Sequence, residues 1–550
     1  MRIKLERISK ACLYLIVFFC IIFFACTILL VLNNGPISTD HSEENVLKDN
    51  NSEKNEDERP AELTTIMNLS PTACNLYDTS ENIFFTKEDG SKLNIKDLKG
   101  KVVVITFWAS WCKYCNEELK KSNEFLDIVN KFDNVEFLLV NKLDGDKETK
   151  ESAIKYLNEN NIPFHTVFDE NLKIYKELGI KIVPTTLIID INGNILTYKA
   201  GEIKSTGELE SLINYGLEGA HSATERFITK KLTNHLGGVN IKFKSETKEK
   251  STLSESQGIM LEYSLLKNDK NLFNNTLNYI NEYMKKDRLV SWKVQDGNAT
   301  RVNAAIDDLR IYRALNEGKL KFGIENINLN KYRNSIYKYN VSKKRLVDSY
   351  DFKYKEKAEK LTLCYADFKT LKELSKNDKR FIDVYDNCID IVENGYISDK
   401  FPLYYSKYDY NGETYTMDEL NSSEAMMTLL HLVEVGELKE NTVSWIKDTI
   451  RNTGILGRYK VNGDVVSGYE YESTAVYAIV ALIGNEMNDQ ELINLALSRM
   501  EKMRINDTQN EYDGAFGNAD GTEIYSFDQC MALLAYGRLE ERSNDQNEWE

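Results

Sequence analysis

Proline is scarce in this chain of 550 residues, and it is almost absent from the larger part of it. Five of the six prolines precede residue 185, and only Pro402 follows. A proline inside a helix costs about 3 kcal/mol. The long stretch almost free of proline therefore favours a mainly helical domain.

Histidine and positive charge are also in short supply. The chain has five histidines, no HExxH or HxxxH pattern, and a single CxxC motif without a second ligand pair. We therefore expect no metal site and no cofactor. The net charge of −16 argues against nucleic acid as a partner, because phosphate binding needs a basic face.

The first 64 residues carry the pattern of a membrane anchor. Residues 11–32 contain no charge and no proline, and they are long enough to span a bilayer as a helix. The basic flank 1–10 is expected in the cytoplasm, and residues 33–64 are expected to be a disordered acidic tether outside. A cleaved signal peptide is the alternative, although its apolar region is usually about 7–15 residues long. The sequence predicts a single-pass protein of the cell membrane with extracytoplasmic domains.

Two regions with different patterns follow the tether. Residues 65–218 alternate apolar runs of strand length with helical segments at 117–131 and 147–160, and a hairpin turn is expected at Asn192-Gly193. This order predicts an α/β domain. Residues 221–545 show amphipathic helical periodicity with short connections, which predicts an all-α domain of about a dozen helices.

The first domain contains the motif CKYC at residues 112–115. It follows a predicted strand at 101–107 and opens a helix, where free N–H groups and the helix dipole favour a thiolate. We predict that Cys112 is the nucleophile and that Cys115 resolves the mixed disulfide. A metal knuckle would need a second ligand pair, and a structural disulfide in so short a loop would stabilise little.

The flanks of the motif resemble a known family. FWASWC at residues 107–112 and VPTT at 183–186 are similar to the thioredoxin fold, specifically to the membrane-anchored TlpA/ResA-like thiol-disulfide oxidoreductases. Tyr114 stands where that family usually has a proline before the second cysteine. The resemblance implies an enzyme of thiol–disulfide exchange.

The resemblance also implies site residues and partners. Pro184 would be the cis-proline that faces the thiols, and the partner protein would contact Trp111, Val183 and Thr185. The partners would be exported proteins with disulfides or thiols, and a transmembrane electron donor or acceptor. Reduction is the expected direction, and an oxidase that runs the same cycle in reverse is the alternative. An acid assists proton transfer in the family. Asp144 is the candidate here, and a solvated loop acid is the alternative reading of it.

Three segments of the helical half resemble a second family. In order and spacing, SESQG at 254–258, AAIDDLRIYRAL at 304–315 and YEYES at 469–473 are similar to motifs of glycoside hydrolase family 8. This resemblance implies an (α/α)6 toroid of helical hairpins. Trp292, between the first two segments, would offer a stacking face to a sugar.

The family 8 resemblance implies an inverting glycosidase, which needs a protonated carboxyl and a carboxylate that activates water. Glu255 would be the general acid. Asp308 or Asp307 would bind the sugar at the cleavage point. Glu472 and Asp528 are the candidates for the base.

Departures from the motifs leave alternatives open. Ser256 replaces a glycine of the family, so a non-catalytic glycan-binding toroid and a scaffold stand beside an active glycosidase. For the whole chain, the alternative is a surface glycan-binding or glycoside hydrolase protein with an accessory thioredoxin module. Cys364, Cys388 and Cys530 are expected to be buried thiols, unless two of them pair, and Cys74 is a further disulfide candidate.

Overall fold

The computed structural model of the protein describes residues 76–77, 83–243, 251–286, 289–325 and 327–547. The predicted membrane segment, the tether and Cys74 lie outside the described residues. Within the described ranges, no helix combines the length and the apolar character that a membrane crossing requires.

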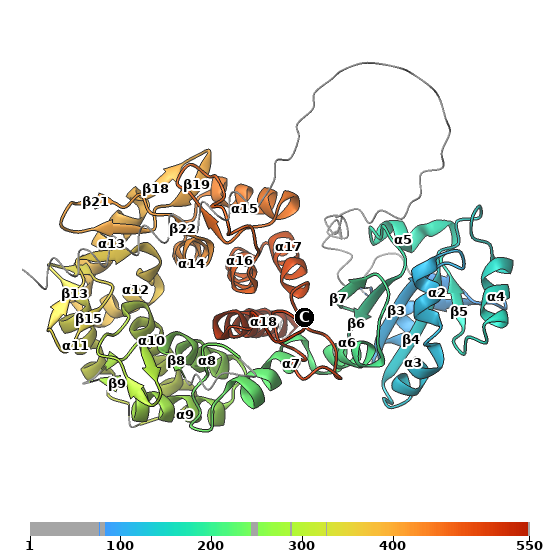
Figure 1. The fold of residues 1–550 in the computed structure, drawn as a ribbon, viewed down its shortest axis with the longest axis horizontal. Coiled ribbons are helices and arrows are strands. Elements are labelled where there is room, and N and C mark those ends of the chain that lie inside the picture. Colours follow the sequence, from blue (N-terminus) through green and yellow to red (C-terminus); the bar gives the residue numbers. More distant parts are fainter. Residues whose placement is uncertain (1–75, 78–82, 244–250, 287–288, 326, 548–550) are drawn as a thin grey trace, which may run out of the picture. The chain divides into compact units, whose positions relative to one another are not determined.

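The first domain is built on a seven-stranded sheet. Its strands are β1 (Phe84–Thr86), β2 (Lys92–Asn94), β3 (Val102–Trp108), β4 (Val135–Asn141), β5 (Thr166–Phe168), β6 (Thr185–Ile189) and β7 (Ile195–Ala200). The strand order is β2-β1-β5-β4-β3-β6-β7 (Figure 1). Strand β4 pairs in parallel with β3 and β5, whereas β6 pairs antiparallel with β3 and β7.

The central strand β3 is apolar on both sides because both faces of the sheet are covered. Val102 and Val104 belong to one hydrophobic cluster, and Val103 and Ile105 belong to another. Successive side chains of a strand point to opposite faces, and a parallel strand buried on both faces is a continuous apolar run. The run VVVITFW in the sequence is therefore this strand.

Five helices accompany the sheet: α2 (Lys113–Leu119), α3 (Ser122–Val129), α4 (Lys150–Glu159), α5 (Lys173–Glu177) and α6 (Thr206–Glu218). The predicted α/β domain is confirmed. The single helix predicted over 117–131 was wrong, because α2 ends before α3 begins. At the junction the N–H of Lys121 bonds to the carbonyl of Glu118 at 3.0 Å, a tighter i→i−3 turn that interrupts the α-helical pattern.

The second domain is mainly helical. Its helices are α7 (Ala220–Phe227), α8 (Ser254–Leu266), α9 (Lys270–Tyr279), α10 (Ala305–Phe322), α11 (Leu329–Asn340), α12 (Phe368–Asn377), α13 (Ile382–Asn394), α14 (Ser422–Val433), α15 (Glu440–Asn452), α16 (Thr474–Met487), α17 (Gln490–Glu501) and α18 (Ser526–Asn547). Helices α8, α10, α12, α14, α16 and α18 each contact the next, and α18 returns to α8 (Figure 1). They form a closed inner ring.

Inner and outer helices differ in the faces that they bury. Helix α16 is buried at every residue from Thr474 to Gly484, so it is apolar all round, as a helix enclosed by others must be. The outer helix α15 buries only Thr442, Val443, Ile446 and Ile450. Its exposed side explains its amphipathic pattern.

Short antiparallel strands connect the helices of this domain. They are β8 (Ser251–Leu253), β9 (Lys285–Lys286), β10 (Leu289–Val290), β11 (Lys293–Gln295), β12 (Asn298–Ala299), β13 (Val341–Ser342), β14 (Arg345–Leu346), β15 (Tyr350–Asp351), β16 (Glu356–Lys357), β17 (Lys360–Thr362), β18 (Tyr396–Ser398), β19 (Phe401–Tyr404), β20 (Lys407–Asp409), β21 (Thr414–Tyr415), β22 (Leu420–Asn421) and β23 (Arg458–Tyr459). Strands of two to four residues are too short for a periodic signal, so the sequence did not predict them.

The first turns of several inner helices meet at one end of the ring. The hydroxyls of Ser256 on α8 and Ser526 on α18 lie 2.8 Å apart. Asp528 on α18 accepts a hydrogen bond of 2.9 Å from Ser473, which precedes α16. Polar residues that lie far apart in the sequence therefore gather where N–H groups and helix dipoles point outward.

Candidate active sites

The two cysteines of the CKYC motif sit where β3 gives way to α2. Cys112 is the N-cap of α2, and its sulfur accepts a hydrogen bond of 3.2 Å from the N–H of Cys115. The two sulfurs are joined as a disulfide with Cα atoms 5.3 Å apart. Cys112 is 5% exposed and Cys115 is 1% exposed, so an incoming group reaches Cys112 first.

The loop before β6 faces these thiols. The Val183–Pro184 peptide bond is cis, and the carbonyl oxygen of Val183 lies 3.3 Å from the sulfur of Cys112. Thr185 is buried, and its hydroxyl donates to the carbonyl of Ile182 at 2.8 Å. The structure brings the residues of the predicted thiol site together.

A buried glutamate that the sequence analysis missed lies one helical turn beyond Cys115. Glu118 is 1% exposed, and its carboxylate accepts a hydrogen bond of 2.7 Å from the N–H of Ile203. Burial raises the pKa of Glu118 to about 8 despite this bond. Residues at i and i+3 share one face of a helix, so the spacing CxxCxxE was the signal that could have found it.

The acid chosen from the sequence, Asp144, has a different environment. Its carboxylate accepts hydrogen bonds from the N–H groups of Glu148 (2.9 Å) and Asp146 (3.0 Å). Burial raises the pKa of Asp144, but these backbone bonds outweigh it and leave the pKa below its ordinary value. Asp144 shapes the loop that follows β4.

That loop is fastened to the thiol site by Glu148. Its buried carboxylate accepts bonds from the N–H of Ser110 (3.0 Å), the hydroxyl of Ser110 (2.7 Å) and the side-chain amide of Asn141 (2.7 Å). The segment leading into Cys112 is therefore anchored to β4 and to the loop after it.

The carboxylates at the end of the ring where Ser256 meets Ser526 form the second candidate site. Glu255 lies in the first turn of α8. Burial and then the charge of Asp307 raise the pKa of Glu255 to about 8, with Arg310 acting against them and Asp528 adding to them. A carboxyl group with such a pKa holds its proton at neutral pH, as a general acid must.

The structure distinguishes the neighbours Asp307 and Asp308. Asp307 accepts a hydrogen bond from Ser254, which precedes Glu255, and lies 3.8 Å from the guanidinium of Arg310. Burial raises its pKa. Asp307 is therefore the aspartate of the Glu255 site.

Asp308 belongs to a closed polar network on the other side of α10. It accepts hydrogen bonds from the N–H of Val290 (3.1 Å), from Asn303 (2.6 Å) and from Tyr332 (3.0 Å). Burial raises its pKa to about 7 in spite of these donors. These contacts tie α10 to β10 and α11, which is a structural role.

The two candidates for the base also have different surroundings. Glu472 forms an ion pair of 3.0 Å with Arg499 of the outer helix α17, and it accepts a hydrogen bond from Tyr477. The negative charge of Asp528 instead helps to raise the pKa of Glu255. One of its oxygens accepts bonds from Ser473 (2.9 Å) and from the N–H of Ala475 (2.8 Å).

Trp292 borders the same end of the ring. Its backbone carbonyl accepts a hydrogen bond of 3.0 Å from the N–H of Ser254, so it lies beside the first turn of α8. Its side chain is exposed. An exposed indole next to the carboxylates is the feature expected of a surface that stacks on sugars.

Comparison with known proteins gives separate matches for the two domains. Residues 78–198 match the AhpC/TSA family, and residues 223–348 match the glycosyl hydrolases of family 8. The thiol-disulfide oxidoreductase ResA of Bacillus thuringiensis (strain Al Hakam) is 34% identical over 121 residues, which are 22% of this chain and 67% of that protein.

Two further relatives are longer matches. YdaJ of Bacillus subtilis (strain 168), named as a lipoprotein, is 29% identical over 327 residues, which are 57% of this chain and 86% of that protein. A solved structure, described as a novel alpha-amylase from Clostridium perfringens, is 30% identical, with a TM-score of 0.54, and covers 58% of this chain and 97% of its own. This chain belongs to the ResA-type thioredoxin-like proteins, and residues 223–348 of its second domain are similar to glycosyl hydrolase family 8.

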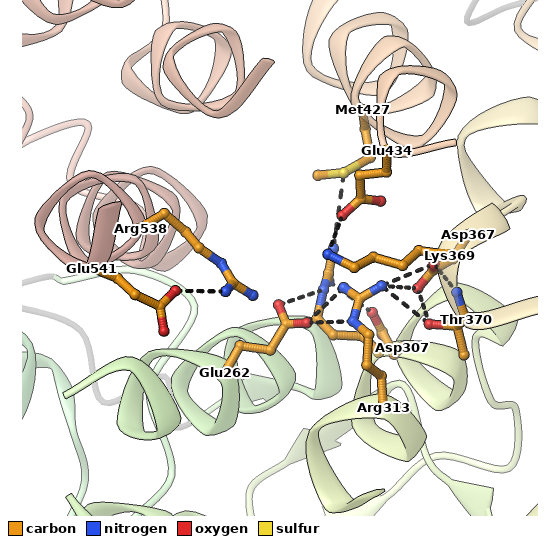
Figure 2. A network of polar contacts seen from close by, with 11 residues as sticks. Glu262, Asp307, Arg313, Asp367, Lys369, Thr370, Met427, Glu434, Arg538 and Glu541 are labelled. Carbon is orange, nitrogen blue, oxygen red and sulfur yellow. Dashed lines mark hydrogen bonds and ion pairs between the residues drawn. The ribbon is translucent and has the colours of Figure 1, made fainter. Parts of the chain in front are cut away.

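The family 8 domain also contains a buried charge network, to which Asp307 belongs (Figure 2). Arg313 of α10 donates to Glu262 of α8 at 2.6 and 3.0 Å and to both oxygens of Asp367 at 2.9 Å. The two carboxylates hold the pKa of Arg313 well above its ordinary value, against the effect of burial. The network ties α8 and α10 to the start of α12.

One group of donors in the described part of the family 8 domain has the composition of a metal site. Ligand atoms of Asp367, His431 and Glu434 lie within 4.8 Å of one another. However, Arg313 already binds both oxygens of Asp367, and the amine of Lys369 lies 3.7 Å from Glu434. Two cations already lie against these carboxylates, so we assign the group to the charge network.

The three cysteines of the family 8 domain, Cys364, Cys388 and Cys530, are buried free thiols. Burial raises the pKa of Cys388 to about 12, which makes the thiolate rare. These thiols are core residues and do not extend the redox chemistry of the ResA-type domain.

Proposed function

We propose that the chain is a membrane-anchored, extracytoplasmic protein whose ResA-type domain reduces disulfides of exported proteins. The observation that carries this proposal is the placement of Cys112 at the start of α2, 3.3 Å from the Val183 carbonyl, with Cys115 buried behind it. The lipoprotein name of YdaJ supports a location outside the cytoplasm. Anchoring would come from residues 11–32.

The exchange takes two steps. The thiolate of Cys112 attacks one sulfur of the partner disulfide, a mixed disulfide forms, and the other partner sulfur leaves as a thiolate. Cys115 then gives up its proton and attacks Cys112, which releases the partner's second thiolate. Two electrons pass to the partner, the Cys112–Cys115 disulfide remains, and a transmembrane donor would reduce it again. Glu118 is the nearby buried group that could take the proton of Cys115.

The test is capture of the intermediate. A Cys115→Ala variant, reduced and mixed with a disulfide-containing exported protein, should accumulate a mixed disulfide that mass spectrometry identifies at Cys112. The unaltered chain should turn over and leave none. Equal capture by a Cys112→Ala variant, or none by Cys115→Ala, would contradict the exchange mechanism.

A second activity, glycoside hydrolysis, is favoured by the protonated Glu255 beside two further carboxylates. Glu255 would donate the proton to the departing oxygen, Asp307 would bind the sugar at the cleavage point, and Asp528 would activate water. The relative from Clostridium perfringens, described as an alpha-amylase, supports an α-linked glucan as the substrate class. A glycan-binding surface protein with an accessory thioredoxin module is the alternative.

Hydrolysis would be measured on α- and β-1,4-linked glucans. The unaltered chain should cleave the α-linked series, with a rate that falls as the pH rises through about 8 and Glu255 loses its proton. Glu255→Gln should lose about 10²–10⁴-fold in rate. Glycan binding without turnover would support the alternative.

A further inference from the structure

An apolar surface flanks the reactive sulfur of the ResA-type domain. Trp111 precedes Cys112 and is 44% exposed, and Ile182 precedes the cis-proline loop residue Val183 and is 43% exposed. Cys112 itself is almost buried between these segments. Any protein that presents a disulfide to Cys112 must therefore cover both side chains.

Lysines surround this apolar surface. The amine of Lys142 lies 5.4 Å from the ring centre of Trp111 and 5.1 Å from that of Tyr175. The amine of Lys147 lies 5.8 Å from the ring centre of Trp111. Cation–π contacts within about 6 Å are attractive, so these contacts hold two positive charges beside the entrance to Cys112.

Two of the three acids of the same loop are engaged by hydrogen bonds. Asp144 is occupied by backbone N–H groups, and Glu148 is buried against Ser110 and Asn141. Asp146 is the exposed acid of the loop. On the other side of the sulfur, Lys113 is exposed within the motif, with its amine 5.9 Å from the ring centre of Tyr114.

Cations are therefore gathered at the ring of Trp111. A protein with a net charge of −16 places the amines of Lys142 and Lys147 against this ring, next to its reactive thiol. Charged surfaces of opposite sign steer association and raise its rate 10–10³-fold at low salt, whereas like charges suppress it. The surface at Cys112 is complementary to an acidic segment.

We propose that the partner presents its disulfide on an acidic segment, with carboxylates contacting Lys142 and Lys147 and apolar side chains contacting Trp111 and Ile182. The inference rests on the proposed exchange function and adds the chemical class of the partner to it. In the reaction the Cys112–Cys115 dithiol is oxidised to the disulfide, and the partner disulfide is reduced to two thiols.

The test uses two peptides that contain one disulfide each and differ only beside the cysteines. One carries Asp and Glu, and the other carries Asn and Gln at the same positions. Stopped-flow tryptophan fluorescence follows oxidation of the reduced full chain by each peptide at about 20 mM and about 500 mM salt. We expect the acidic peptide to react about tenfold faster at low salt, and the difference to vanish at high salt because salt screens exposed charges.

Variants locate the effect. The double variant Lys142→Gln/Lys147→Gln should bring the rate ratio of the two peptides close to one. The control Lys96→Gln/Lys99→Gln removes the same charge near the start of β3 and should keep the ratio. Ratios of one for the unaltered chain, or equal losses in both double variants, would overturn the proposal.

A small neutral disulfide, 2-hydroxyethyl disulfide, separates the two levels of the inference. If the reduced chain fails to react with it and with both peptides, the exchange function itself is wrong. If it reacts with the neutral disulfide and shows no preference between the peptides, exchange stands and the acidic partner is wrong.

Discussion

The thiol site and the carboxylate site of this chain share one feature and differ in how they are assembled. Each contains a glutamate whose pKa is raised to about 8 by removal from water, Glu118 beside the thiols and the half-buried Glu255 in the helical ring. The thiol site comes mainly from one contiguous segment that turns from strand into helix. The carboxylate site comes from the first turns of helices as far apart as Ser256 and Ser526.

The neighbours of the two glutamates differ as well. A backbone N–H group contacts Glu118, whereas the charge of Asp307 adds to the effect of burial on Glu255. A backbone donor is fixed by the fold, but a neighbouring acid titrates too. The proton of Glu255 therefore depends on the state of the whole site, and that of Glu118 depends mainly on its burial.

The largest expected effect separates Asp528 from Glu472 within the carboxylate site. Asp528→Asn should lower the rate of glucan hydrolysis by about 10²–10⁴-fold, because water would lose its general base. Glu472→Gln should cost less than about tenfold, since Glu472 is engaged by Arg499 and Tyr477. The measurement is kcat on a defined oligosaccharide.

A chemical rescue supplies the control for that prediction. Azide needs no general base, so it should restore turnover of an activated aryl glycoside by Asp528→Asn and leave Glu472→Gln unchanged. If Glu472→Gln is the slower variant and responds to azide, the roles of the two acids are exchanged.

The next largest effect is expected from a substitution in the buried charge network of the family 8 domain. Arg313→Met would leave Asp367 buried without the cation that binds both of its oxygens and would leave Glu262 only the more distant Arg310, at 3.8 Å. Breaking a buried pair in this way costs about 3–5 kcal/mol. We expect the free energy of unfolding of this domain, measured in urea, to fall by that amount. The ResA-type exchange rate should stay the same.

A matched arginine is available on the surface. Arg451 pairs with Asp448 and Glu491 but is 40% exposed, so Arg451→Met should cost under about 1 kcal/mol. If the two variants have the same free energy of unfolding, the buried charge network drawn in Figure 2 contributes little to folding.

The same contrast between the two sites explains how much of each could be predicted from the sequence. Cys112 and Cys115 lie in a short motif, so strand and helix patterns were enough to single them out, whereas Pro184 came from the resemblance of VPTT to the family's cis-proline loop. The spacing CxxCxxE placed Glu118 on the same helix face as Cys115, but its burial against the loop at Ile203 depends on tertiary packing. The fold class of both domains was predicted, because periodicity and proline placement are properties of whole segments.

The carboxylate site shows where such reasoning ends. Asp307 and Asp308 are neighbours in the sequence, but about 100° separates them around a helix, and one residue in register decides which of them faces Glu255. The pairing of Glu472 with Arg499 depends on how α17 packs outside the ring. Order and spacing gave a set of candidates, and packing gives each of them different surroundings.

That one-residue difference can itself be tested. Asp307→Asn should lower the rate of hydrolysis about 100-fold with little change in stability. Asp308→Asn should instead lower the free energy of unfolding by about 1–3 kcal/mol, because buried donors lose their acceptor. If Asp308→Asn instead lowers the rate of hydrolysis and leaves the stability of the domain unchanged, Asp308 rather than Asp307 contacts the sugar.

The smallest expected effect concerns Glu118 and asks whether the two glutamates share a function or only a pKa. Below about pH 8 Glu118 holds a proton, and above it the carboxylate can accept the proton of Cys115. The rate at which Cys115 resolves a mixed disulfide should therefore rise through pH 8 beyond the rise from thiol ionisation. Glu118→Gln should lack this step and be about tenfold slower at pH 9, a modest general-base contribution.

The adjacent exposed acid is the control for this last experiment. Glu117 pairs with Lys120 at 2.6 Å on the outer side of α2, so Glu117→Gln should keep the step near pH 8. If Glu118→Gln keeps it too, Glu118 supports the Ile203 loop and moves no proton. Burial would then have raised the pKa of both glutamates to the same value without giving them the same function. A raised pKa describes the surroundings of an acid, and it serves a function only where a reacting proton lies within reach.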